Sequence, residues 1–184
     1  MTMQADLQAL LHEMAAFLEA RALGPVDLYL LGGCSLILFD GRVGATKDLD
    51  VVAESLRRSD EDGAQSLLDT FGRSSGRAPY LDPVPGGLPP LPIGWSDRAV
   101  PRPSPSEALR LWTLDLADLI ITKLRRWHPR DRADIRHVCD RHPEVRERLA
   151  QVSASDFFEI DWWEQMEPRR DHVIDYLDGR TDEL

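Results

Sequence analysis

The sequence predicts an α/β fold in which a small mixed sheet precedes a mainly helical C-terminal half. Short apolar segments bounded by Gly, Pro and Asp dominate the first half, whereas apolar residues recur at helical spacing in most of the second. With 42% hydrophobic residues, a chain of 184 residues can bury a sizeable core. We therefore expect one compact unit, with the core in residues 1–110 and a helical part in residues 111–184 that closes a cleft.

The first predicted elements are a helix, a strand and a second helix, joined by glycine turns. The apolar residues of 3–22 fall at helical spacing: Leu7, Leu10, Leu11, Met14, Phe17 and Leu18. Gly24-Pro25 ends this helix, and 26–31 is a short, largely buried strand. The apolar run 34–39 fits a strand or a helix. We favour a helix that begins on Gly32-Gly33, because a second strand would need a turn of its own.

Two further strands are expected, at 48–53 and 80–84, with a surface helix over 60–72 between them. Nine of the thirteen prolines lie between positions 79 and 105. Because proline lacks the N–H group that a ladder or helix needs, this segment is expected to form a long loop that wraps over the sheet.

The C-terminal half is expected to be helical. Residues 104–107, Ser-Pro-Ser-Glu, have the capping residue and early proline of a helix start, which predicts a helix that continues through 109–112. Further helices are expected at 115–126 and 130–142. The remainder, 145–178, is helical but weakly patterned.

Composition narrows the class of protein. The net charge of -10 argues against a surface built to hold duplex DNA, so any contact with nucleic acid should be local. Two cysteines are too few for a disulfide framework or a four-thiolate zinc site. With neither an apolar stretch of about 18 residues nor a signal peptide pattern, we expect a cytoplasmic protein that does not bind membranes.

The glycine pair is a candidate phosphate site. Glycines between a strand and a helix let the backbone approach an anion, and the N–H groups of the following helix, from Cys34 onward, point at it. The alternative is that Gly32 and Gly33 serve only a tight turn.

Asp48 and Asp50 are the candidate metal ligands. Two residues apart on a strand, they lie on the same face and can share a divalent cation, while Leu49 points into the core. Carboxylates together with substrate phosphates are the ligands that Mg²⁺ favours. The alternative is a solvated strand end with ordinary acidic residues.

Three charged residues lie on apolar helical stripes in the second half. Lys123 falls on the apolar side of its helix, and Asp131 and Asp134 share a stripe with Ile135. Charges on core-facing stripes need a partner or a ligand. An ion pair from Lys123 to Asp134 or Asp131 would meet that need and fix one helix against the other.

These motifs together resemble the polymerase-beta-type nucleotidyltransferase superfamily, with AbiEii-like and MenT-like bacterial toxins as the nearer look-alikes. Gly32-Gly33, Asp48 and Asp50 match its strand, glycine turn, helix and Asp-x-Asp strand in order and spacing. A second motif, later in the chain, is also similar to that of the superfamily. It consists of Asp118-Leu119, Lys123-Leu124, Arg126, Asp131 and Asp134-Ile135. The strong part of the resemblance covers residues 28–53 and 116–138.

The resemblance implies a two-ion site for Mg²⁺ or Mn²⁺, with Asp82 as the third carboxylate beside Asp48 and Asp50. Asp82 could also be a turn residue, because Pro83 adjoins it. Lys123 is expected to approach the triphosphate, helped by Arg125 or Arg126, with Asp134 orienting it. The resemblance places the remaining nucleotide contacts at Gly32, Gly33, Cys34, Thr46, Lys123, Arg126 and Asp131.

The implied activity moves a nucleoside monophosphate from a nucleoside triphosphate to an acceptor, which could be RNA or tRNA, a protein or a small molecule. A toxin of a toxin-antitoxin or phage-defence system fits this activity, with an antitoxin or a second copy of the chain as partner. One alternative is a catalytically weak module that binds nucleotides, or binds an antitoxin through the acidic segment 153–184. The other is a structural or interaction protein.

Overall fold

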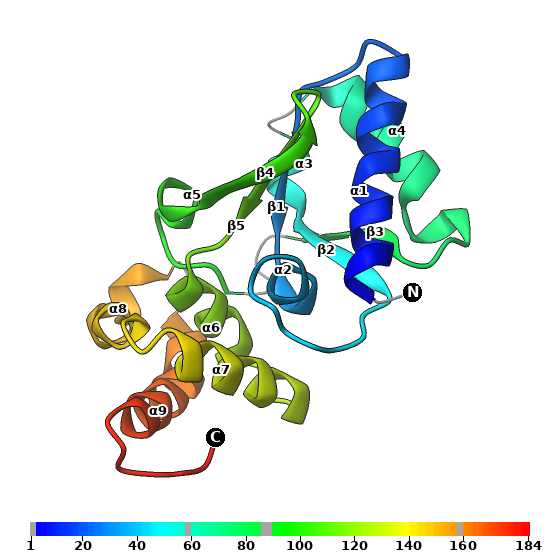
Figure 1. The fold of residues 1–184 in the computed structure, drawn as a ribbon. Helices are drawn as coiled ribbons and strands as arrows, with labels where there is room; N and C mark the ends of the chain where they lie inside the picture. Colours follow the sequence, from blue (N-terminus) through cyan, green and yellow to red (C-terminus); the bar gives the residue numbers. More distant parts are fainter. Residues whose placement is uncertain (1–2, 58–59, 86–89, 158–159) are drawn as a thin grey trace. The chain divides into compact units, whose positions relative to one another are not determined.

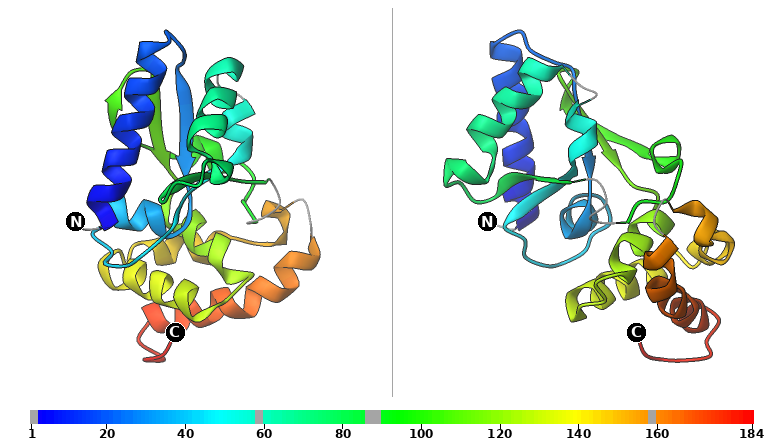
Figure 2. Two further views of the ribbon diagram at one scale, coloured as in Figure 1. Left: turned by 90° about the vertical axis from the view of Figure 1, so that its right-hand side faces the viewer. Right: turned by 180° about the vertical axis from the view of Figure 1, so that it is seen from behind.

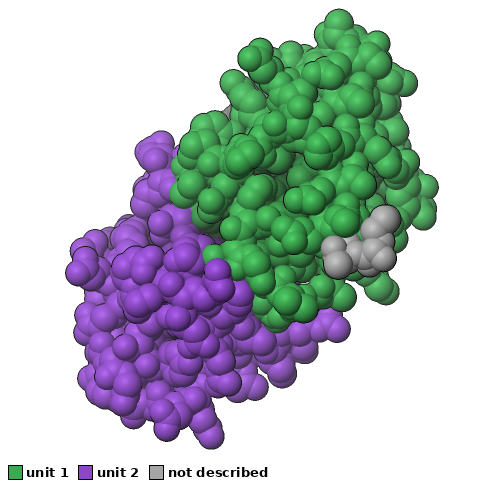
Figure 3. Space-filling model, in the orientation of Figure 1, with its two compact units in different colours: residues 1–86, 99–114 green, residues 87–98, 115–184 purple. Residues whose placement is uncertain are grey.

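The computed structural model describes residues 3–57, 60–85, 90–157 and 160–184. The chain forms two compact units, shown in two colours in Figure 3. The first consists of residues 1–86 and 99–114, and the second of residues 87–98 and 115–184. All strands of the described residues belong to the first unit, and the second is helical.

A five-stranded mixed sheet forms the centre of the first unit, which confirms the predicted fold class (Figure 1). Its strands, in chain order, are β1 (Val26–Leu30), β2 (Asp48–Val52), β3 (Tyr80–Val84), β4 (Val100–Ser106) and β5 (Leu109–Thr113). The order across the sheet is β3-β2-β1-β5-β4. β1 is antiparallel to β2 and parallel to β5, β2 is parallel to β3, and β4 is antiparallel to β5.

One face of this sheet is the hydrophobic core. Helices α1 (Met3–Ala20) and α4 (Glu61–Phe71) pack over it, as the views of Figure 2 show. The strand residues buried there are Val26, Leu28, Leu30, Leu49, Val51, Leu81, Leu109 and Leu111. Because strand side chains alternate, the residues between them point to the other face. Three short helices complete the unit: α2 (Gly32–Phe39), α3 (Ala53–Arg57) and η1 (Arg73–Ser75).

The prediction of a helix that begins at 104–107 is wrong. Residues 100–113 form a β-hairpin of β4 and β5. Leu109 and Leu111 are buried while Arg110 is exposed, so the period-two pattern of β5 prevails over the local helix-start signal.

The proline-rich segment is also more ordered than a long loop. Beyond residues 86–89, which lie outside the described part, it contains the one-turn helix α5 (Trp95–Arg98) and all but the last residue of β4. β4 tolerates Pro101, Pro103 and Pro105 because it is an edge strand, where only one side of the backbone needs ladder hydrogen bonds.

The second unit is built around α6 (Leu116–Leu124), which contacts α7 (Pro129–Arg141), α8 (Val145–Gln151) and α9 (Ile160–Leu177). The helices predicted at 115–126 and 130–142 are confirmed as α6 and α7. The stretch 145–178 is helical as expected, in α8, the short η2 (Ala154–Asp156) and α9. Within the described ranges, every helix is too short or too polar to cross a lipid bilayer.

Candidate metal and nucleotide site

Asp48 and Asp50 lie on the same face of β2, as their spacing predicts. Leu49 between them is fully buried on the core face, and both aspartates are half-buried. The strand thus presents two carboxylates away from the hydrophobic core.

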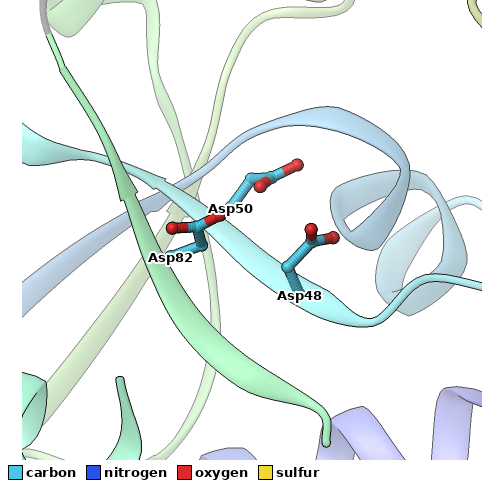
Figure 4. Close-up of side chains that lie close together, drawn as sticks. All are labelled: Asp48, Asp50 and Asp82. Carbon is cyan, nitrogen blue, oxygen red and sulfur yellow. The ribbon is translucent and has the colours of Figure 1, made fainter. Parts of the chain in front are cut away.

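Asp82 joins them from the neighbouring strand. In the parallel register of β2 and β3, Asp50 is the direct partner of Asp82, and Pro83 does not end the strand, which continues to Val84. One carboxylate oxygen from each of Asp48, Asp50 and Asp82 lies within 4.8 Å of the other two (Figure 4). Among the described residues this is the only group of three or more His, Cys, Asp or Glu side chains gathered so closely.

Thr46 orients one of these carboxylates. Its hydroxyl donates a 2.6 Å hydrogen bond to Oδ1 of Asp48, and the two residues flank the turn into β2. The hydroxyl that the resemblance assigns to nucleotide binding therefore also fixes the rotamer of Asp48.

The carboxylate of Asp50 lies against the start of α2. Gly32 has φ of +59°, and a Cβ built there would lie 2.8 Å from Oδ2 of Asp50. Position 32 therefore favours glycine for two reasons. Other residues rarely adopt a positive φ, and their Cβ atom would displace the carboxylate of Asp50. Leu31, which precedes α2, makes no side-chain hydrogen bond to the helix start. The N-terminal end of α2, which carries the positive end of the helix dipole, begins at Gly32 beside Asp50.

Cys34 can contribute only its backbone to a ligand. Its thiol is buried, where it donates a 2.9 Å hydrogen bond to the Leu31 carbonyl, and burial raises its pKa well above the ordinary value. The side chain is therefore a packing element rather than a nucleophile.

Arg73 contacts the third carboxylate and was not identified from the sequence. Its Nη2 donates to Oδ2 of Asp82 at 2.7 Å. The two residues are separated by a helix end and a loop, and no periodic pattern in the sequence connects them.

The donor set fits a hard divalent cation. It consists of oxygen atoms from three carboxylates, which Mg²⁺ and Mn²⁺ accept. Three carboxylates so close together repel one another unless cations compensate their charge, and Arg73 compensates the charge of Asp82.

In the second unit, Lys123 is buried and paired, with 6% of its side chain exposed. Its Nζ lies 2.7 Å from Oδ2 of Asp134 and 3.8 Å from Oδ1 of Asp131. The predicted ion pair between α6 and α7 is confirmed. The approach of Lys123 to a triphosphate stays a prediction.

Asp131 is the centre of a second charged contact. Arg126 donates to both of its oxygens, at 2.7 Å and 2.6 Å, and the His128 backbone N–H donates as well. Burial alone would raise the pKa of Asp131, but these hydrogen bonds and the charge of Lys123 outweigh it and lower the pKa below its usual value. Asp131 thus accepts a hydrogen bond at the start of α7 and binds the guanidinium of Arg126. The side chain of Arg126 is 74% exposed.

Asp118, the first residue of the later motif, has a structural partner that the sequence did not reveal. It is fully buried and accepts a 2.8 Å hydrogen bond from Nε of Arg98. Burial raises its pKa despite that contact. The pair ties α5 to α6.

The chain belongs to a protein family that is described as a nucleotidyltransferase of unknown function (DUF6036), whose model matches residues 5–141. This range contains the three carboxylates, the glycine turn, Lys123 and Asp134. No curated protein and no solved structure matches the chain.

Proposed function

We propose that this protein is a metal-dependent nucleotidyltransferase that moves a nucleoside monophosphate from a nucleoside triphosphate to an acceptor. The observation that supports this most strongly is the cluster of Asp48, Asp50 and Asp82 at 4.8 Å or less, in a chain of a nucleotidyltransferase family. The third carboxylate comes from the neighbouring strand, where Asp82 is the direct partner of Asp50.

Asp48, Asp50 and Asp82 would hold Mg²⁺ or Mn²⁺. Such ions, when bound, activate the attacking oxygen and neutralise the triphosphate. Thr46 keeps Asp48 in the orientation that faces the cluster, and Gly32 leaves room for Asp50. The first N–H groups of α2, at Gly32, Gly33 and Cys34, would bind phosphate oxygens.

Basic side chains would stabilise the negative charge of the phosphates. The family resemblance assigns this role to Lys123 with Arg125 or Arg126. In the structure Arg126 is the exposed one of the three and is already oriented by Asp131. Lys123 is paired with Asp134.

The acceptor would be RNA or tRNA, a protein hydroxyl or a small molecule. A role as a toxin with a cognate antitoxin belongs to the same proposal. The alternative function, a catalytically weak nucleotide-binding module, keeps the site but lacks turnover.

Transfer of label from each α-labelled nucleoside triphosphate, with Mg²⁺ or Mn²⁺ and a cell extract, tests the activity. We expect one nucleotide to label an acceptor, and Asp48→Asn and Asp50→Asn to abolish the labelling. Asp69→Asn, which removes an exposed carboxylate of α4, is the matched control and should retain it. Nucleotide binding without labelling would favour the module, and the absence of both would reject the proposal.

A further inference from the structure

Arg73 pairs its positive charge with the third carboxylate of the cluster. Its Nη2 lies 2.7 Å from Oδ2 of Asp82, and its guanidinium lies 5.5 Å from the ring centroid of Tyr80. Tyr80 precedes Asp82 by two residues on β3, so both contacts place the guanidinium on the face that carries the carboxylates.

The backbone before Arg73 is fixed beside β3. Gly72 ends α4 and forms a parallel bridge with Leu81, the residue before Asp82. A Cβ at Gly72 would collide with the Leu68 carbonyl, so only glycine permits this close ending of the helix. The sheet itself therefore brings Arg73 alongside Asp82.

The arginine side chain is nevertheless free to leave. It is 71% exposed, whereas the side chain of Asp82 is 23% exposed. A guanidinium in water loses little when it exchanges one carboxylate for solvent, because water screens the attraction in an exposed ion pair.

We propose that Arg73 is an internal counter-cation that a divalent ion must displace from Asp82, so that Arg73 sets the metal affinity of the site. It keeps the third carboxylate in place while no ion is bound and weakens binding of an ion that arrives alone. The released guanidinium can then contact a nucleotide phosphate, which favours an ion that arrives with its nucleotide. This inference rests on the proposed function, since it requires that Asp82 be a metal ligand.

Titration calorimetry with Mn²⁺ alone tests the inference on the full chain. We expect Arg73→Gln to bind Mn²⁺ about fivefold to tenfold more tightly than the wild type at low salt, because the ion no longer competes with a positive charge for Asp82. Arg73→Lys keeps the positive charge but lacks the planar guanidinium. Its Mn²⁺ affinity should lie between those of the wild type and Arg73→Gln.

Arg77→Gln is the matched control. Arg77 is an exposed arginine four positions further along the same segment, and it pairs with Glu13 instead of a site carboxylate. Its removal changes the net charge equally and should change the Mn²⁺ affinity less than twofold. Combining Arg73→Gln with Asp82→Asn should remove the gain.

The outcomes separate the two proposals. Equal affinities for wild type, Arg73→Gln and Arg77→Gln, with binding that depends on Asp82, would overturn the role of Arg73 and leave the metal site standing. An equal gain in both arginine variants would also overturn it, because the effect would then come from net charge. Folded variants and wild type that all fail to bind Mn²⁺ would overturn the metal site itself.

Discussion

Lys123 donates a 2.7 Å hydrogen bond from Nζ to Oδ2 of Asp134, and this buried pair connects α6 to α7. Asp131 lies 3.8 Å from the same ammonium group. The ammonium group of Lys123 on α6 therefore lies close to two carboxylates of α7. Loss of the lysine would leave both without that charge.

We predict that Lys123→Met lowers the free energy of unfolding by about 3 kcal/mol, because Asp134 would remain buried without the positive charge of Lys123. Replacing both Lys123 and Asp134 with Met should recover much of this loss. Urea denaturation of the wild type, both single variants and the double variant measures the coupling. Lys47→Met, at an exposed lysine, is the control and should change stability by less than about 0.5 kcal/mol.

If the double variant is no more stable than the single ones, the pair is not the source of the loss. The same proteins also test the predicted phosphate contact. A folded double variant that binds triphosphate and monophosphate as the wild type does would show that Lys123 serves the fold alone.

Asp131 should make stability depend on pH. Its pKa in the folded protein lies below that of an unfolded aspartate, about 3.9, chiefly because the hydrogen bonds from Arg126 and the Lys123 charge outweigh burial. Its ionised form therefore stabilises the fold above about pH 4, and this contribution disappears as the pH falls through the folded pKa.

Asp131→Asn lacks this titration. The difference in unfolding free energy between wild type and variant should be constant from about pH 6 to 8 and shrink below about pH 4. Urea denaturation at intervals from pH 8 to 3 measures it. Arg126→Gln should make the decline smaller, because the folded pKa of Asp131 then lies closer to the unfolded value and less stabilisation remains to be lost. Parallel profiles for wild type and Asp131→Asn would contradict the assignment.

Asp48→Asn and Asp50→Asn should each abolish Mn²⁺-dependent nucleotide binding without unfolding the protein. Both residues are half-buried on the face away from the core, so the loss of charge leaves the packing of Leu49 and Val51 unchanged. Calorimetry with Mn²⁺ and a nucleoside triphosphate decides the matter, with circular dichroism as the test of folding. Unchanged affinity in both variants would exclude them as metal ligands.

Much of the fold follows from local pattern. The helices at 3–22 and 115–142 and the strands at 26–31 and 48–53 have a periodicity that agrees with their final burial. The hairpin at 100–113 was predicted incorrectly, because proline is tolerated there only on account of the edge position of β4. Edge position is a property of the whole sheet and has no local signal.

The carboxylates of the candidate site could be predicted from the sequence, but their arginine contact could not. Period two is enough to place Asp48 and Asp50 on one face, and the resemblance suggested Asp82. The contact of Arg73 with Asp82 depends on the bridge between Gly72 and Leu81, and that of Arg98 with Asp118 on how α5 packs on α6. Both are long-range contacts between single residues, which periodicity does not encode.

Gly32 gives a test of how closely the glycine turn and the carboxylates are coupled. Gly32 and Gly41 both have positive φ, +59° and +68°, so an alanine at either position is strained by about 1 kcal/mol. They differ in surroundings. A Cβ at Gly32 would lie 2.8 Å from Oδ2 of Asp50, whereas a Cβ at Gly41 has no atom of the described residues within 4 Å.

Gly41→Ala is therefore a control for the strain alone. We predict that Gly32→Ala and Gly41→Ala lose similar stability from strain, and that only Gly32→Ala also weakens Mn²⁺ binding, by about tenfold or more, because Asp50 must move. Urea denaturation and Mn²⁺ calorimetry on both variants give the two quantities. If Gly32→Ala binds Mn²⁺ as tightly as Gly41→Ala does, the glycine serves the turn, and the position of Asp50 beside α2 has no part in metal binding.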